Sequence, residues 1–141
     1  MLTETRSTRL VKGSDLNHHG TLFAGRMAEW FVETCFLAGA RLLGNPDDLV
    51  CVKIHGLAFT KSANPGDIIE IVASPAKTGR TSITIGAEVI INGEAVPAVR
   101  GFTTFVCVDG KGKPRAHGLS LPEEWIEGHK ELCEEAEKLP R

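Results

Sequence analysis

The residues best suited to chemistry stand in a short polar loop, residues 17–21, just before a long apolar segment. Asn17 can donate its side-chain amide to a water or a carbonyl, and it can equally cap the turn. His18 and His19 can orient water or bind substrate, or they can simply face solvent. Thr21 can hydrogen-bond a reacting water. Because a helix is predicted to begin here, its free N–H groups offer a place for negative charge.

The segment after this loop predicts a helix over about residues 22–43, since apolar residues recur at helical spacing. The run Gly-Asn-Pro at 44–46 predicts its end. Glu33 is the candidate general base on this helix, because a carboxylate can take a proton from water; a carboxylate can also attack a carbonyl carbon directly. Arg26, Glu29 and Glu33 share one helical stripe, so a solvent-facing role for Glu33 is the alternative.

The elements that must position these residues are mostly strands. The turn pairs Gly79-Arg80 and Asn92-Gly93 separate alternating apolar runs, as in β-hairpins, and Pro75 predicts a bulge or an edge position. We expect the strands after the helix to form a meander. The predicted strands cover about residues 3–11 (a short edge strand), 50–59 with an irregularity at Gly56, 68–73, 81–91 and 99–108.

These elements predict an α+β fold in one domain, residues 1–141, with an antiparallel sheet of about five strands and one long central helix. Residues 121–139 predict an amphipathic, acidic surface helix. One helix cannot cover both faces and both edges of such a sheet, so we expect association, most often as a two-fold dimer.

Composition excludes several classes of protein. A net charge of −2 and a pI of about 6.2 give no reason to expect a nucleic-acid partner. No apolar run has the length of a membrane span, and residues 1–11 lack the apolar core of a signal peptide. The four cysteines are far apart, which favours a cytoplasmic protein without disulfides. No group of residues has metal-ligand spacing, so neither a metal nor a separate cofactor is expected.

Five motifs, in order along the chain, carry a resemblance to a known family. They are residues 17–25 (Asn, Gly, Thr, then Phe-Ala-Gly), residues 27–34 with Trp30, Phe59 followed by Gly66-Asp67, residues 79–82, and Val108-Asp109 with residues 112–115. This order resembles the hotdog-fold acyl-CoA thioesterases, in particular the bacterial and mitochondrial acyl-CoA hydrolase branch, over roughly residues 8–117.

The resemblance implies a hotdog fold, in which the sheet wraps around the helix, and hydrolysis of an acyl-CoA thioester. The backbone from Phe23 to Gly25 would polarise the thioester carbonyl, and the acid would come from the helix of the facing subunit. Coenzyme A is then part of the substrate, and the assembly is a homodimer or a higher homo-oligomer (a tetramer or hexamer). The residues implied to bind coenzyme A are Arg80, Thr81 and Ser82, with Lys61, Lys113 and Arg115 extending the basic surface.

One departure concerns the acid itself. The family's acidic residue falls at Val32, and the carboxylate here is at the next position, Glu33. Glu33 is either the retained neighbour of a lost catalytic residue or the final glutamate of another branch's Trp-Phe-Glu-Glu helix. Two other functions therefore stay open. One is a hotdog dehydratase or hydratase, whose His–Glu separation of fourteen residues matches His19 and Glu33 but whose accompanying prolines are absent. The other is a non-catalytic acyl-CoA binding module.

Overall fold

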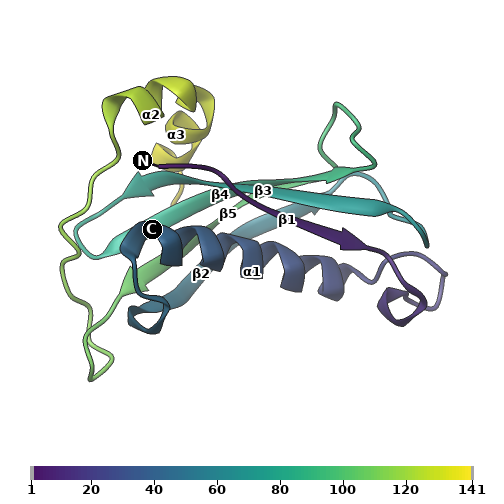
Figure 1. Cartoon of the computed structure of the whole chain (residues 1–141), viewed down its shortest axis with the longest axis horizontal. Coiled ribbons are helices and arrows are strands. Elements are labelled where there is room, and N and C mark those ends of the chain that lie inside the picture. The colour runs from purple at the N-terminus through teal and green to yellow at the C-terminus, as the bar shows by residue number, and fades with distance from the viewer. Residues whose placement is uncertain (1, 141) are drawn as a thin grey trace.

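The computed structural model describes residues 2–140. A five-stranded antiparallel sheet, in the order β1-β3-β4-β5-β2, packs its inner face on one long helix, α1 (Figure 1). The expected α+β arrangement is therefore confirmed. The strands are β1 (Thr5–Leu10), β2 (Leu49–Phe59), β3 (Ile68–Thr78), β4 (Ser82–Ile91) and β5 (Val99–Cys107), and the helices are α1 (Ala24–Leu43), α2 (Glu123–Gly128) and α3 (Lys130–Glu137).

Helix α1 is held by one apolar stripe that faces the sheet. Its buried residues recur every three to four positions, as a helix packed along one side requires. Gly44 ends the helix with a φ of 88°, a left-handed conformation that glycine adopts without steric cost. The residues of the buried stripe are Met27, Trp30, Phe31, Thr34, Cys35, Ala38 and Gly39.

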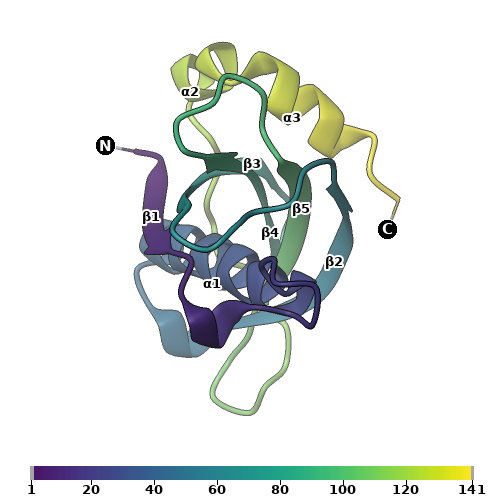
Figure 2. The same ribbon diagram turned by 90° about the vertical axis from the view of Figure 1, so that its right-hand side faces the viewer.

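The sheet supplies the other half of this core through alternating residues of its central strands. Phe31 and Phe105 are fully buried between helix and sheet, and the isoleucines and valines of β3 and β4 pack around them. Figure 2 shows the sheet curving around α1, with β1 and β2 on either side of the helix. The inner core is thus continuous from one edge of the sheet to the other.

The expected meander is wrong in one respect, the place of β2. Only β3, β4 and β5 follow one another as hairpins, whereas β2 pairs with β5 at the far edge of the sheet. The register shifts between Ile54 and Leu57, and Gly56 has a φ of 93°, so the expected irregularity at Gly56 is confirmed. Chain order alone did not reveal that α1 connects two strands, β1 and β2, at opposite edges of the sheet.

Two other turn predictions are confirmed. A register shift separates Pro75 from Lys77, and β1 pairs with β3 only as far as Ala73, so Pro75 lies at a bulge with no β1 partner. Asn92 and Gly93 both have positive φ, 50° and 70°, as a type I′ turn requires. The chain nevertheless loops out before β5 begins at Val99.

The outer face of the sheet carries the C-terminal segment. Instead of one helix over 121–139, the structure has α2 and α3, separated at His129, whose φ of −130° is not helical. Trp125 anchors α2, because its indole Nε1 donates to the carbonyl of Pro75 at 2.9 Å. A small second core joins Ala136 of α3 to Ala76 and Phe102 of the sheet. None of the helices within residues 2–140 is long and apolar enough to cross a membrane.

Candidate active site

The loop before α1 is organised by Asn17. Its side-chain oxygen accepts from the backbone N–H groups of His19 at 2.9 Å and of Thr21 at 3.2 Å. Its amide nitrogen donates to the Thr21 hydroxyl at 3.0 Å. An amide nitrogen carries two protons, so one remains for a water or a substrate. The structure therefore joins the side chains of Asn17 and Thr21, and it joins Asn17 to the backbone of His19.

The two loop histidines are exposed on the same side of this turn. Their ring centroids are 3.9 Å apart, with the planes inclined by 41°. Gly20, with a φ of 79°, closes the turn, because its N–H donates to the carbonyl of Asn17 at 3.1 Å. His19 is thus placed to meet a ligand that approaches the loop from solvent.

The first turn of α1 leaves donors unused. The N–H groups of Arg26 and Met27 both donate to the carbonyl of Phe23, which leaves those of Ala24 and Gly25 without intrahelical partners. A Cβ at Gly25 would stand 2.5 Å from the ring of Phe23, so this ring lies directly over the glycine. Such an N-terminus can stabilise an oxyanion.

A buried carboxylate that sequence reasoning treated only as a possible cap fixes the loop to the helix. Asp15 is 6% exposed, and its side chain accepts from the N–H of Lys12 at 2.9 Å. Arg26 approaches the same carboxylate, with Nε 3.5 Å from Oδ1. The carbonyl of Asp15 also accepts from the N–H of Phe23 at 2.9 Å. Asp15 thus positions both sides of the polar loop.

Glu33 lies elsewhere in the same chain. Helical rise places it about 13 Å along the axis from Ala24. Arg9 of β1 donates to Glu33 through Nη2 at 2.5 Å, and the guanidinium lies over the Trp30 ring, 5.6 Å from its centroid. The side chain of Glu33 is 52% exposed. Within one subunit, the structure does not bring Glu33 to the polar loop.

Val32 occupies a different side of α1. It is one residue before Glu33, so it is rotated by about 100° around the helix axis. Val32 is half-buried and packs against the core, whereas Glu33 is exposed and directed to β1. The neighbouring carboxylate therefore does not replace a side chain at position 32 in space.

A second polar region lies on the outer face of the sheet. A pocket of about 410 Å³ is lined by Arg80 and Ser82 and by two strand lysines, Lys53 and Lys77. Thr81 lies between Arg80 and Ser82 in the chain. Its backbone carbonyl accepts from the N–H of Cys107 at 2.7 Å. The predicted turn at residues 79–82 is thus part of a basic pocket.

The same pocket includes a row of hydrogen-bonded side chains. His55 Nε2 lies 2.7 Å from the Thr104 hydroxyl, which lies 2.8 Å from that of Thr84. Partial burial, and then the nearby Lys53 ammonium, lower the pKa of His55 below its ordinary value. Lys53 and His55 are two positions apart on β2, so strand alternation placed both on one face. That signal was available in the sequence, although it did not specify the pocket.

Lys61 and Arg115 do not line this pocket. Lys61 forms an ion pair with Glu94. Arg115 pairs with Asp48, its Nη2 lying 3.0 Å from Oδ2. Over the described part of the chain, no group of three or more His, Cys, Asp or Glu side chains is arranged to hold a metal ion.

Comparison with known proteins identifies the relatives of this chain. Residues 19–98 match the thioesterase superfamily. An uncharacterized acyl-CoA thioester hydrolase of Buchnera aphidicola (subsp. Schizaphis graminum) is 33% identical over 115 residues, which cover 75% of this chain and 82% of the relative. The acyl-CoA thioester hydrolase YciA of Escherichia coli K12 is 28% identical over 116 residues, 76% of this chain and 85% of that protein.

A solved structure extends the likeness to the fold. An apo-hexameric acyl-CoA thioesterase superposes with a TM-score of 0.81 at 32% identity, covering 95% of this chain and 86% of that one. The architecture expected from the sequence motifs, a hotdog fold, is confirmed by this neighbour.

Proposed function

This chain belongs to the thioesterase superfamily, and from that premise we propose that it hydrolyses an acyl-CoA thioester to a free acid and coenzyme A. The observation that supports this proposal most is the start of α1. There, two N–H groups without intrahelical partners adjoin a loop whose amide and hydroxyl groups can hold water.

In the proposed reaction, the thioester carbonyl oxygen accepts from the N–H groups of Ala24 and Gly25. A water held by the remaining amide proton of Asn17 loses a proton to a carboxylate and attacks the carbonyl carbon. The oxyanion that forms is stabilised by the same N–H groups and by the helix dipole. Its collapse breaks the C–S bond and releases the coenzyme A thiolate, which takes a proton.

We propose Glu33 as this carboxylate, supplied by the facing subunit. Glu29 and Glu33 are the two carboxylates in the sequence of α1, so a base on this helix is one of them. Arg9 holds Glu33 in one orientation, whereas Glu29 is 64% exposed and lies 4.0 Å from Arg26. A carboxylate in fixed orientation is the better base, because less ordering is needed at reaction.

The proposed site needs a second copy of the chain. Strand β2 is an edge of the sheet, and it exposes four large apolar side chains: Val50, Val52, Ile54 and Phe59. An exposed apolar edge strand pairs readily with another strand. We therefore propose a homodimer through β2. Such dimers can assemble further, and the related structure named above is a hexamer.

The coenzyme A moiety is assigned, in this proposal, to the turn at residues 79–82. Arg80 and Ser82 present a guanidinium and a hydroxyl to the basic pocket, and both groups bind phosphate well.

We also propose a cytoplasmic location, because all four cysteines are free, two of them fully buried beside the core.

The test is hydrolysis of acyl-CoAs from acetyl to palmitoyl, together with aromatic ones, followed by the released thiol. Turnover should fall by about 100-fold or more in Glu33→Gln. The matched control, Glu29→Gln, removes the same charge from the same helix and should retain activity. Asn17→Ala should lower kcat more than it changes KM, because its amide acts on the water.

Absence of turnover with every acyl-CoA, alongside measurable coenzyme A binding, would falsify the hydrolase and favour a binding module. Hydration or dehydration of a hydroxyacyl thioester would instead point to the His19–Glu33 alternative. Loss of turnover in Glu29→Gln but not in Glu33→Gln would reassign the base while keeping the reaction.

A further inference from the structure

The basic pocket on the outer face is set apart by its charge. Its lining contains two lysines and one arginine, Lys53, Lys77 and Arg80, and no carboxylate. The whole chain has a net charge of −2, so this concentration of positive charge is local. Within residues 2–140, the guanidinium of Arg80 makes no ion pair. Three cations and several hydroxyls line about 410 Å³, which is a chemistry suited to a phosphorylated ligand.

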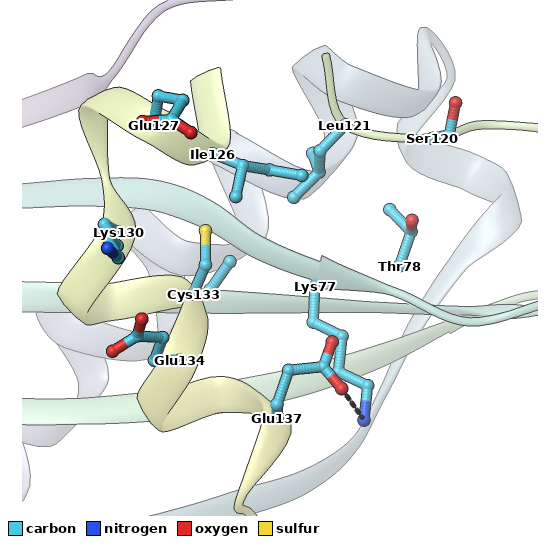
Figure 3. Close-up of a pocket in the computed structure, with 11 residues that line it drawn as sticks. Lys77, Thr78, Ser120, Leu121, Ile126, Glu127, Lys130, Cys133, Glu134 and Glu137 are labelled. Carbon is cyan, nitrogen blue, oxygen red and sulfur yellow. Dashed lines mark ion pairs between the residues drawn. The ribbon is translucent and has the colours of Figure 1, made fainter. Parts of the chain in front are cut away.

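The neighbouring pocket has a mixed lining. It has a volume of about 420 Å³ and lies between β3 and the C-terminal helices, lined by Glu127, Glu134 and Glu137 and by two lysines, Lys77 and Lys130. Lys77 belongs to both pockets, and Figure 3 shows its side chain directed at Glu137. The two pockets therefore meet at Lys77, and its partner Glu137 lies in the neighbouring pocket.

C-terminal residues contact the two lysines of the basic pocket. Glu137, the last residue of α3, places Oε2 3.7 Å from the Nζ of Lys77. Beyond α3, the carbonyl of Pro140 accepts from the Nζ of Lys53 at 3.4 Å. Leu139 and Pro140 also line the pocket, beside Ser82 and Thr104. The C-terminal segment thus makes contacts that a bound phosphate would also make.

We propose that Glu137 is an intramolecular competitor for the phosphate groups of coenzyme A, with Lys77 as the cation for which both compete. This inference rests on the proposed function, since it takes the nucleotide of coenzyme A as the ligand. In the free protein Lys77 pairs with Glu137. When the nucleotide binds beside Arg80, Lys77 turns to a phosphate, and Glu137 is released to solvent.

The geometry makes this exchange easy. The side chains of Lys77 and Glu137 are 37% and 68% exposed, and an exposed ion pair contributes little to stability. A phosphate carries more charge than a carboxylate, and Arg80 adds a second contact. Glu137 therefore lowers affinity without blocking the site, so α3 sets how tightly the nucleotide is held.

The experiment is calorimetric titration with adenosine 3′,5′-bisphosphate and with coenzyme A. Lys77→Gln should weaken binding about tenfold, because a charge-assisted contact is lost. Glu137→Gln should tighten binding about twofold to fivefold, the range for removal of an exposed ion-pair partner. Glu134→Gln is the matched control: it removes the same charge from α3 and from the same neighbouring pocket, but Lys77 pairs with Glu137 and not with Glu134.

The outcomes separate this inference from the proposed reaction. Unchanged binding in Lys77→Gln, or equal tightening in Glu137→Gln and Glu134→Gln, would overturn the competition. Hydrolysis of an acyl-pantetheine, which lacks the nucleotide, should be the same in Glu134→Gln and the original protein. If no thioester is hydrolysed while Glu137→Gln still tightens nucleotide binding, the reaction is wrong and the competition stands.

Discussion

The inner face of the sheet holds α1 through a continuous apolar core, whereas the outer face holds α2 and α3 through a small cluster and several ion pairs. The inner helix has 20 residues with one buried stripe, and the longer outer helix has eight. Apolar burial is not directional and cannot be exchanged for a ligand contact, whereas an exposed ion pair can. The difference suggests a rigid support for the reacting groups and an adjustable surface for the nucleotide.

The largest expected effect is in the inner core. Phe31→Ala should lower the free energy of unfolding by about 3–5 kcal/mol, because it removes a fully buried ring and leaves a cavity. Leu132 of α3 is half-buried, so Leu132→Ala should lower the free energy of unfolding by clearly less than Phe31→Ala does. Urea denaturation at one fixed protein concentration measures both. A larger cost for Leu132→Ala would break the comparison between the two faces.

The next effect is a loss of stability at high pH. Burial between α1 and the sheet raises the pKa of Cys35 from 9.0 to about 12. The thiol therefore ionises at a lower pH in the unfolded protein than in the folded protein. Its contribution to the free energy of unfolding is full below about pH 9 and is lost as the pH rises towards 12. Each pH unit in this window should cost at most about 1.4 kcal/mol.

Denaturation curves between pH 8 and 11 test this loss, with Cys35→Ala as the comparison. The chain contains no tyrosine, so no phenol ionises in this range. The variant should be less stable at pH 8 but should show a flatter decline above pH 9. Parallel declines in the two proteins would mean that the thiol of Cys35 is not the group that responds.

A smaller effect is expected at the anchor of α2. Trp125→Phe keeps most of the buried ring but removes the donor to Pro75, which should cost about 1 kcal/mol. The loosened C-terminal segment should also expose Cys133 to a thiol reagent sooner than Cys35. Labelling rates followed by mass spectrometry measure this order. Faster labelling of Cys35 would show that α1 opens before α2 and α3.

The smallest effect concerns Arg100, which joins the sheet to α3. Its guanidinium lies 3.4 Å from Glu88, 3.7 Å from Glu131 and 2.9 Å from Glu135. Arg100→Gln should lower stability by about 1 kcal/mol or less at low salt, because these pairs are partly exposed. The difference should shrink in 1 M NaCl. A cost that salt does not change would indicate packing rather than charge.

A helix or a turn was predictable where its own residues showed a clear pattern. The apolar stripe from Met27 to Ala38 predicted α1, and the turn chemistry of Asn92-Gly93 predicted a reversal. The place of β2 was not predictable, since pairing with β5 depends on contacts across the sheet. The break at His129 was also missed, because the amphipathic pattern continues through it.

The candidate site divides in the same way. Asn17, Thr21 and Gly25 are close in sequence, so their proximity followed from one loop and one helix start. Arg9 of β1 contacts Glu33 of α1, and Lys53 of β2 lines the same pocket as Arg80. These residues are far apart in the sequence, and nothing in the local pattern indicates that they meet. Which carboxylate acts, and from which subunit, stays a prediction.

The position of β2 has a consequence for how the protein is made. His55 on β2 and its partner Thr104 on β5 are 49 residues apart in the chain. During synthesis, β2 leaves the ribosome before β5 exists, and its exposed apolar side chains have no strand to pair with. Such a strand is prone to aggregate until its partner emerges. Pairing with β5 therefore protects one edge of β2 in the growing chain, and the other edge stays open until a second copy of the protein pairs with it.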